Sequence, residues 1–317
     1  MKAALLKQHF KDPKDIQIPV VDLPVPELKK GECLIQVACS GVNPSDASGA
    51  LGYFPKAKLP RIPGRDFAGV VVKGDSNYIG KKIWGTGGAS GLYSDGSLAE
   101  FKVVPETAIA EIPKNFSLLQ AGIQTLPFVT AFYCLVERGR LKSGESVLII
   151  GALGQVGRAA MSVCQWKKCK PIALVRDKSI EEAKSLGWEA LSSISGNFDL
   201  VLNTTGNIYW EAILKSLKKF GRVVTIGAQE GKRDASFNLL DLYRANQEII
   251  GVNTVDVDAI QNGKMLNQMK SAFESEELTP LELESDAVYP LEQAAEAYRQ
   301  VLTGHTGKRI AIKVASI

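Results

Sequence analysis

Residues 146–160 read SVLIIGALGQVGRAA, an apolar β-branched run followed by three glycines and a helix-like stretch. The run is typical of a buried strand, and the glycines mark its turn into the helix. Gly154 and Gly157 occupy the second and third places of the dinucleotide-binding fingerprint, and Ala152 stands in the first place. The second glycine lets the backbone approach a pyrophosphate, and the third lets the helix pack closely on the strand.

This glycine turn has two interpretations. As a phosphate cradle, it directs the backbone amides of Gly154, Gln155 and Val156 at the pyrophosphate, with the helix dipole behind them. As a conformational turn, it uses glycine only to connect a strand to a helix. The complete strand–turn–helix context favours the cradle, and we expect a dinucleotide there.

The end of the next strand indicates which dinucleotide binds. NAD enzymes place a carboxylate about 20 residues on, where it bonds the ribose 2′-hydroxyl. This chain reads LVRDK there, with Arg176, Asp177 and Lys178 in succession. A guanidinium fork is complementary to a 2′-phosphate, so we expect NADPH in preference to NADH. In the alternative, Asp177 takes the hydroxyl and Arg176 is an ordinary exposed loop residue.

The pattern around the turn predicts an α/β fold with a doubly wound parallel sheet. From residue 146 onward, apolar strand-like runs alternate with helical stretches, and about six strands fit inside residues 123–263. The runs are SVLIIG, PIALVR, a short strand near 190, FDLVLNTTG, GRVVTIG and EIIGVNT. The predicted helices cover residues 117–138, 155–168, 178–187 and about 208–219.

The remainder of the chain predicts a second, β-rich domain. The first 120 residues contain the strand-like ECLIQVACSGV and FAGVVVKG, separated by segments rich in proline and glycine, such as NPSD. The last 50 residues hold a helix and a strand that we expect to return to this domain. The predicted domains are therefore residues 1–122 with 264–317, and residues 123–263.

Composition narrows the class of protein. A formal net charge of +4 over 317 residues is too weak and dispersed to indicate a nucleic-acid partner. The N-terminus has no apolar core of a signal peptide, and no apolar run is long enough to cross a membrane. Five cysteines form no CxxC pair and leave one over in any disulfide scheme. We therefore expect reduced cysteines and a cytoplasmic location.

Several motifs in order along the whole chain resemble the medium-chain dehydrogenase/reductase superfamily, and within it the zinc-independent quinone oxidoreductases. They are the MKA start, PVPELKKGECLIQVACSGVNPSD, LPRIPGRDFAGVVV, GSLAEFKVVP, the glycine turn, GRVVTIG and LEQAAEAYRQVLTGHTGKRIAIKV. The resemblance implies a GroES-like β-rich catalytic domain split around a Rossmann domain. It also implies a homodimer formed through the Rossmann domain.

The same resemblance predicts that the protein works without zinc. Zinc-dependent relatives carry a cysteine and a histidine ligand where this chain has Asn43 and Arg65. Neither asparagine nor arginine supplies a thiolate or imidazole ligand for Zn²⁺. Cys39 is one nearby thiol, and a buried structural cysteine is the simpler account of it.

The resemblance also implies which residues lie near the nicotinamide. Asn43 is a candidate to donate to an enolate or to contact the cofactor, with a plain turn residue as the alternative. Asp46 is a candidate to contact the cofactor or hold the loop. Tyr53 is a candidate proton donor, with cleft packing as its alternative. Three further cofactor contacts are implied: Thr130, Thr205 and Gly227. The alternative for Thr130 is a hydroxyl bonded to its own helical turn, and for Gly227 a simple turn glycine.

We therefore expect an NADPH-dependent, zinc-free reductase of a quinone or an α,β-unsaturated carbonyl. Such acceptors are electrophilic by themselves, so the protein need only position them, exclude water and bond the developing oxyanion. An enoyl-thioester reductase is the first alternative. A non-catalytic NADPH-binding or structural protein, like the lens crystallins among the relatives, is the second.

Overall fold

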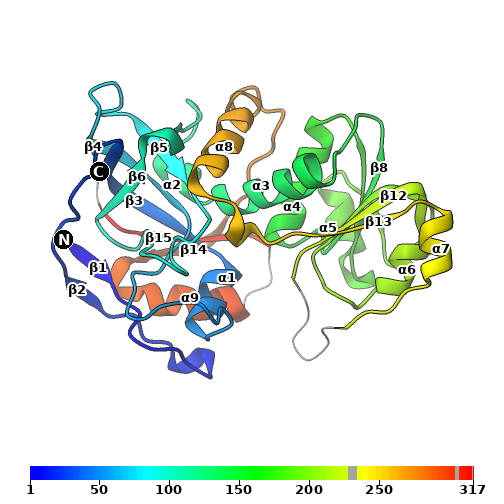
Figure 1. The fold of residues 1–317 in the computed structure, drawn as a ribbon, viewed down its shortest axis with the longest axis horizontal. Coiled ribbons are helices and arrows are strands. Elements are labelled where there is room, and N and C mark those ends of the chain that lie inside the picture. The colour runs from blue at the N-terminus through cyan, green and yellow to red at the C-terminus, as the bar shows by residue number, and fades with distance from the viewer. Residues whose placement is uncertain (228–233, 304–306, 316) are drawn as a thin grey trace. The chain divides into compact units, whose positions relative to one another are not determined.

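The computed structural model describes residues 1–227, 234–303, 307–315 and 317 (Figure 1). The chain divides into two compact units, each with its own sheet. The first contains Met1–Val129, Thr254–Ser275 and Leu281–Ile317, and the second contains Thr130–Asn253 and Glu276–Pro280. Relative to the predicted boundaries, this division moves residues 123–129 and 254–263 to the first unit and residues 276–280 to the second.

The second unit is built on a six-stranded sheet of parallel strands in the order β10-β9-β8-β11-β12-β13. The chain leaves β8 in one direction through β9 and β10, then crosses to the other side of β8 for β11, β12 and β13. This order confirms the predicted doubly wound fold. The strands are β8 (Ser146–Ile150), β9 (Lys170–Leu174), β10 (Glu189–Leu191), β11 (Phe198–Asn203), β12 (Leu217–Thr225) and β13 (Glu248–Gly251).

The central strand β8 is buried on both faces, as its unbroken apolar run predicts. All residues from Val147 to Ile150 are buried, and neighbours from β9 and β11 pack against them. The helix α4 that follows turns its small residues, such as Ala159 and Ala160, inward. The helices of this unit are α4 (Gln155–Trp166), α5 (Ile180–Ser185), α6 (Trp210–Lys215) and α7 (Leu239–Arg244), and α3 (Thr125–Phe132) ends in it.

The first unit contains a seven-stranded sheet in which β3 is the central, longest strand. The order is β14-β15-β3-β4-β5-β7, and β6 pairs with β3 as well. The C-terminal strand β15 runs antiparallel to β3, so the last residues of the chain lie in the same sheet as the first fifty. The strands of this sheet are β3 (Glu32–Val42), β4 (Phe67–Lys73), β5 (Lys82–Gly85), β6 (Phe101–Pro105), β7 (Ala110–Glu111), β14 (Leu283–Pro290) and β15 (Arg309–Lys313). A separate antiparallel pair contains β1 (Lys2–Ala4) and β2 (Val20–Asp22).

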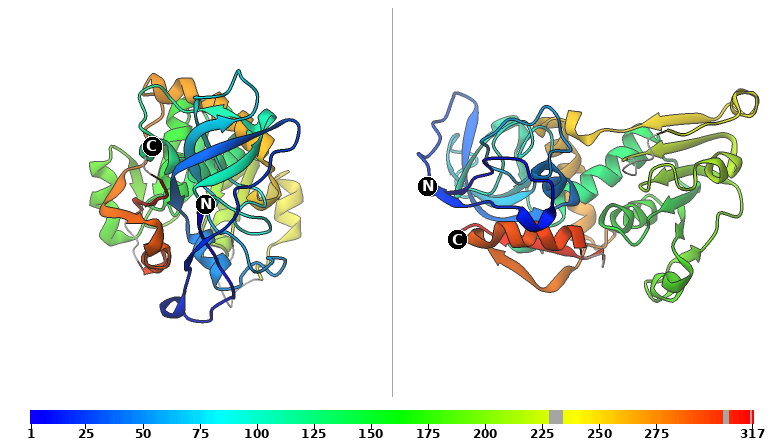
Figure 2. Two further views of the ribbon diagram at one scale, coloured as in Figure 1. Left: turned by 90° about the vertical axis from the view of Figure 1, so that its left-hand side faces the viewer. Right: turned by 90° about the horizontal axis from the view of Figure 1, so that it is seen from below.

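The helices of the first unit are short except for α8. Helix α9 packs against α1, which brings the end of the chain beside its N-terminal part (Figure 2). The helices are α1 (Pro44–Ala50), α2 (Leu118–Gly122), α8 (Ala259–Glu274) and α9 (Ala294–Thr303). In the described residues, no helix has both the length and the apolar character needed to cross a bilayer.

Some local predictions were wrong. The NPSD segment was taken as a breaker, but its proline is the first residue of α1, where a missing N–H costs nothing. The helix predicted over about 208–219 ends at Lys215, because Leu217 already pairs with Phe198 in the sheet. The helix predicted over 117–138 is α2, α3 and a π-helical stretch, Tyr133–Arg138.

Candidate functional site

The turn after β8 requires glycine at two positions for steric reasons. Gly151 has φ +79°, and a Cβ built there lies 2.3 Å from the Thr204 Oγ1. At Gly157 a Cβ lies 2.2 Å from the Gly151 carbonyl oxygen and 2.6 Å from the Ala152 Cα. Gly157 is therefore the residue that lets α4 approach the strand, as predicted. Ala152 is fully buried beneath this contact.

Gly154 differs from these two glycines. It is exposed and caps α4 with φ −74°, and a Cβ there comes no nearer than 3.3 Å to its one neighbour, the Gly151 carbonyl oxygen. Its amide donates to that same oxygen (3.0 Å) and so is not available to a phosphate, contrary to the cradle as predicted. In the described part of the chain, the amides of Val156 and Gly157 donate to no acceptor, as expected for the first turn of a helix. The open side of Gly154 and these two amides lie at the N-terminal end of α4, the kind of position where helices bind anions.

The same edge of the sheet carries a polar turn at the end of β11. The side chain of Asn203 is buried; its Nδ2 donates to the Gly206 carbonyl (2.6 Å), and its Oδ1 accepts from the amide and hydroxyl of Thr205 (both 3.1 Å). The Thr205 hydroxyl thus already donates its proton within the turn. Gly227 follows the next strand, β12, with φ +74°, and no atom of the described residues lies within 4 Å of a Cβ built there. The sequence analysis did not predict a role for Asn203. Its one indication in the sequence is an amide side chain at the end of a predicted strand.

Arg176 lies just after β9, whose carboxyl end is at this same edge. Arg176, Asp177 and Lys178 are all exposed. Among the described residues, no hydrogen bond or ion pair engages any of these three side chains, so the guanidinium and the ammonium are both available to a ligand. The carboxyl ends of β8, β9, β11 and β12 therefore carry the predicted contacts of the second unit other than Thr130, at the strand switch where doubly wound sheets bind nucleotides.

In the first unit, Asn43 and Asp46 begin helix α1. The backbone amide and the Nδ2 of Asn43 both donate to the Asp46 Oδ2 (2.9 and 3.0 Å). The Nδ2 also donates to the Asp66 Oδ2 (3.0 Å), and the Oδ1 accepts from the Arg309 Nη1 (3.0 Å). Both protons of the Asn43 amide are therefore used inside the protein. Asn43 therefore connects Asp46, Asp66 and Arg309, while its contact with a substrate or cofactor stays a prediction.

Asp66 is the centre of this buried network. It forms an ion pair with Arg309 (2.9 Å) in which both side chains are fully buried. Its other oxygen accepts from the Thr86 hydroxyl (2.5 Å) and the Leu126 amide (3.0 Å). The sequence offered only a weak signal for it, two charged residues within otherwise apolar strand motifs.

The Asp46 carboxyl has a perturbed pKa. Burial raises the pKa of Asp46 to about 6, aided by the nearby Asp66, while Arg65 and the Asn43 donors oppose the rise. Its Oδ1 is buried without a hydrogen-bond partner in the described residues. A carboxyl group in this setting holds its proton to a higher pH in the folded state than in the unfolded chain.

Asp46→Asn is therefore expected to change how stability depends on pH. Between pH 4 and 6 the folded Asp46 holds a proton that the unfolded carboxyl has released, so the stability present below pH 4 is lost as the pH rises through 6. The asparagine variant lacks this loss, so its free energy of unfolding should rise relative to wild type by about 3 kcal/mol from pH 4 to 7. Urea unfolding at several pH values measures the difference; a difference that does not vary with pH would contradict the shift.

The remaining predicted residues are separate from this network. Tyr53 follows α1 and is about half exposed, and Thr130 is buried in α3. No hydrogen bond from the Thr130 hydroxyl to its own helical turn is present in the described part, so the structural alternative for Thr130 has no support. Cys39 is buried, its Sγ donates to the Leu118 carbonyl, and burial raises the pKa of its thiol to about 12.

No group of three or more His, Cys, Asp or Glu side chains that could hold a metal occurs within residues 1–227, 234–303, 307–315 and 317. His305 lies outside the described residues. All five cysteines are free thiols.

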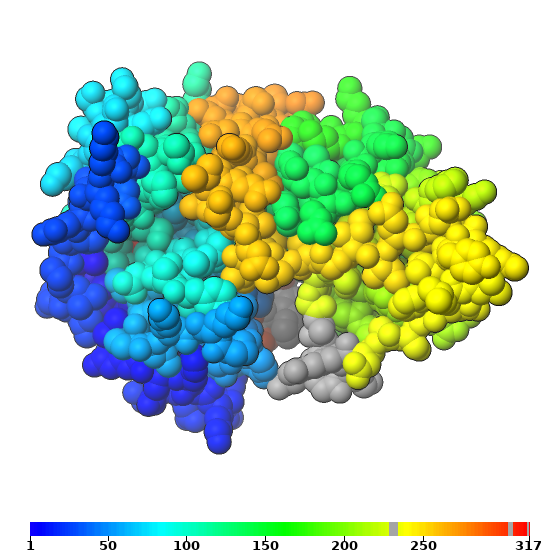
Figure 3. All heavy atoms as spheres, in the orientation of Figure 1, coloured from blue at the N-terminus to red at the C-terminus, as the bar shows by residue number. Residues whose placement is uncertain are grey.

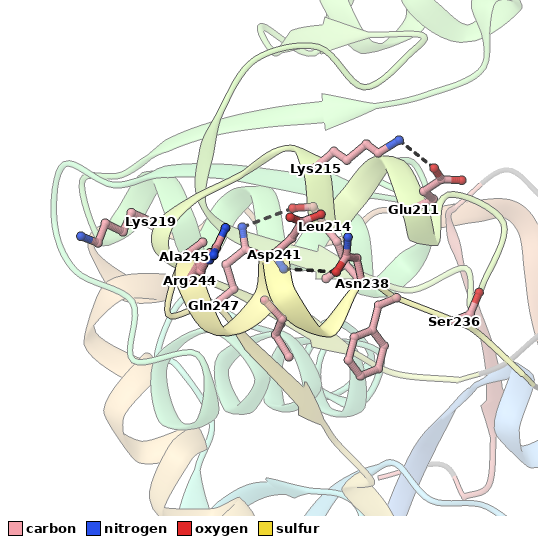
Figure 4. A pocket seen from close by; sticks show the side chains of 12 residues that line it. Glu211, Leu214, Lys215, Lys219, Ser236, Asn238, Asp241, Arg244, Ala245 and Gln247 are labelled. Carbon is pink, nitrogen blue, oxygen red and sulfur yellow. Dashed lines mark hydrogen bonds and ion pairs between the residues drawn. The ribbon is translucent and has the colours of Figure 1, made fainter.

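A pocket of about 860 Å³ opens elsewhere on the second unit, between α6 and α7 (Figure 4). Its lining includes Lys219 in the first half of β12 and Gln247 just before β13, so it lies toward the amino ends of these strands. The dinucleotide edge is at their carboxyl ends, and this pocket is therefore a different site. The neighbouring helix α7, in the yellow surface of Figure 3, exposes Leu239 and Tyr243.

Comparisons with known proteins agree with this geometry. The model of the alcohol dehydrogenase GroES-like domain matches residues 29–114, and that of the zinc-binding dehydrogenases matches residues 177–310. A zinc-type alcohol dehydrogenase-like protein of Schizosaccharomyces pombe is 31% identical over 307 residues, covering 95% of this chain and 94% of its own. The human quinone oxidoreductase is 27% identical, covering 91% of both chains.

Two further likenesses extend the comparison. An NADPH-dependent alkenal/one oxidoreductase of Arabidopsis thaliana is 27% identical, covering 90% of this chain and 72% of its own. The crystal structure of an alcohol dehydrogenase superfamily protein from Novosphingobium aromaticivorans superposes with a TM-score of 0.87 at 26% identity, covering 99% of this chain and 100% of that one. The match spans both units and the glycine turn between β8 and α4. The chain is thus a nicotinamide-dependent oxidoreductase that belongs to the medium-chain dehydrogenase/reductase superfamily, within its quinone oxidoreductase-like family.

Proposed function

We propose that this protein is an NADPH-dependent reductase that delivers hydride to a small quinone or α,β-unsaturated carbonyl without zinc. The observation that carries the proposal is the nucleotide edge of the second unit. There, the open turn at Gly154 and the exposed, uncommitted guanidinium of Arg176 follow two neighbouring parallel strands. The names of the quinone and alkenal/one reductase relatives support the choice of acceptor.

The residues of the second unit fit a phosphorylated dinucleotide. The amides of Val156 and Gly157 would hold the pyrophosphate at the α4 N-terminus, and Arg176 with Lys178 would pair with the 2′-phosphate. Gly227 and Thr205 would border the nicotinamide at the ends of β12 and β11. When bound, NADPH supplies a hydride from its nicotinamide ring.

For this reaction the protein needs to position the acceptor and to stabilise the negative charge that develops on it. A quinone or enone accepts hydride at carbon, and the negative charge then develops on its oxygen. Hydrogen-bond donors that face this oxygen lower the activation barrier of hydride transfer. Exclusion of water strengthens the electrostatic interaction between these donors and the oxygen. Tyr53, as an amphipathic phenol beside α1, is proposed as a proton donor. The choice of NADPH, the homodimer and the cytoplasmic location are further parts of this proposal.

Arg176→Ala is expected to separate the two cofactors. Loss of the guanidinium removes its charge-assisted bonds to the 2′-phosphate, so the Kd for NADPH should rise about 10- to 100-fold. The Kd for NADH, which lacks that phosphate, should change less than about 2-fold. Fluorescence titration with both dinucleotides measures this, and Lys184→Ala on the exposed face of α5 is a matched control. Equal weakening of both cofactors would show that Arg176 does not recognise the 2′-phosphate.

The acceptor class is tested by following NADPH oxidation with three acceptors: a naphthoquinone, a small enone and a crotonyl thioester. We expect turnover with the quinone or the enone. Turnover confined to the thioester would replace the proposal with an enoyl-thioester reductase. Tight NADPH binding without turnover on any acceptor would favour a non-catalytic protein.

A further inference from the structure

Three arginines are buried in the first unit, and two of them have an evident structural role. In Arg61 all three guanidinium nitrogens donate to backbone carbonyls, at 2.9–3.1 Å. Arg309 donates to the Ile123 and Val42 carbonyls, to Asn43 and to Asp66. Both of these guanidinium groups are therefore satisfied, as buried polar groups generally are.

Arg65 is different. Its Nη1 donates to the Ser45 hydroxyl (3.1 Å), but its Nε and Nη2 are buried and have no partner among the described residues. The side chain is only 2% exposed. Each buried donor left without an acceptor costs about 1–3 kcal/mol, so a hydrogen-bond acceptor placed at these two nitrogens would be stabilised.

The surroundings of Arg65 define what that acceptor must be. Asp46 and Asp66 attract the guanidinium and oppose the lowering of its pKa by burial, yet no ion pair joins it to either carboxylate in the described part of the chain. Tyr93 also lies close enough to interact with it, and the Tyr93 ring packs edge-on against Phe54 at 6.4 Å. The guanidinium is thus near Tyr93, whose half-buried ring contacts the half-buried ring of Phe54.

We propose that Arg65 binds the oxygen of the hydride acceptor and stabilises the negative charge that develops on it. The inference rests on the proposed function. Hydride adds to the electrophilic carbon, the displaced π-electron pair moves to the conjugated oxygen, NADPH becomes NADP⁺, and the oxyanion then takes a proton from the proposed donor Tyr53, which regains one from water. Nε and Nη2 present two N–H groups in the fixed fork of a guanidinium, which suits a single oxyanion.

The aromatic pair fits the same acceptor. A quinone or enone is flat and conjugated, and the rings of Phe54 and Tyr93 offer it apolar surface next to the cation. Because Nε and Nη2 are covered in this structure, the acceptor reaches them only when side chains beside Arg65 move. The Asp46 Oδ1 is also buried and unpartnered among the described residues. The negative charge of this carboxylate opposes the lowering of the Arg65 pKa by burial.

The first test is Arg65→Met, with Arg61→Met as the matched buried control. For Arg65→Met we expect kcat/KM for the acceptor to fall about 100-fold or more, the typical loss of an oxyanion donor. The Kd for NADPH should stay within about 2-fold. Added guanidinium at non-denaturing concentration should partly restore the rate. Arg61→Met should lower thermal stability and gain nothing from guanidinium. The proposal would be overturned if added guanidinium restored the rate equally in both variants, or if Arg65→Met left kcat/KM for the acceptor unchanged.

A second test does not depend on turnover. 4-Nitrophenolate is a coloured oxyanion, and its binding to the wild type with NADP⁺ should lower the apparent pKa of 4-nitrophenol. Arg65→Met should abolish this shift, and Arg61→Met should keep it. If the wild type shifts the nitrophenol pKa but reduces no acceptor, the result supports an anion site at Arg65 and contradicts the proposed reductase function. A wild type that reduces quinones without any nitrophenol shift would refute Arg65 alone.

Discussion

Asp66→Ala is expected to lower the free energy of unfolding by about 3–5 kcal/mol, the usual cost of removing one member of a buried ion pair. Asp66 and Arg309 are both fully buried, so the variant leaves a guanidinium without its counter-charge. The Asn43 amide, the Thr86 hydroxyl and the Leu126 amide lose an acceptor at the same time. Desolvation of these groups is already complete, and no exposed route to water compensates for the loss.

Urea unfolding followed by circular dichroism measures this effect, and Asp22→Ala is the matched control. Asp22 also pairs with a cation, Lys2 (2.9 Å), but at the surface, where ion pairs contribute little, so its loss should leave stability unchanged. Asp66→Asn should fall between the two, because an asparagine oxygen can still accept from Thr86 while the charge is gone. Equal stability of Asp66→Ala and Asp22→Ala would contradict the role assigned to the buried network.

The Asp66–Arg309 pair also illustrates what the sequence could not predict. The two residues are 243 positions apart, and their contact depends on β15 pairing with β3. The sequence pattern predicted these strands, but no local rule joins Arg309, at the start of β15, to Asp66, just before β4. For the same reason Asn43 was predicted as a possible substrate donor, whereas the fold uses both protons of its amide to connect Asp46 with Asp66.

The dinucleotide-binding edge of the second unit was easier to predict, because residues close together in the sequence determine its structure. A buried strand, a glycine turn and a helix follow one another within residues 146–166, and the parallel order of strands then brings Arg176 to the same edge. The exceptions depend on hydrogen bonds that the pattern does not specify. The Gly154 amide donates back to Gly151, and Leu217 joins the sheet because Phe198 lies opposite it.

The two glycines of this turn should respond very differently to the same added methyl group. In Gly157→Ala the Cβ meets the Gly151 carbonyl oxygen at 2.2 Å, and a backbone atom cannot rotate away as a side chain does. Alanine gains about 1 kcal/mol of helix propensity, but overpacking against a rigid backbone costs about 1–3 kcal/mol or more, so the clash outweighs the gain. We expect Gly157→Ala to displace the start of α4, to lower stability and to weaken NADPH binding about 100-fold or more.

Gly154→Ala is the matched variant, since its φ of −74° suits alanine and its Cβ has an open side. Its free energy of unfolding should change by less than about 1 kcal/mol, as for other helix-cap substitutions of this kind. The methyl group nevertheless occupies the space through which a pyrophosphate approaches the backbone, so the Kd for NADPH should rise about 10-fold or more. Fluorescence titration and urea unfolding of both variants separate the two effects. If Gly154→Ala binds NADPH as tightly as wild type, the glycine serves only the turn, and the cofactor lies elsewhere on the edge of the sheet.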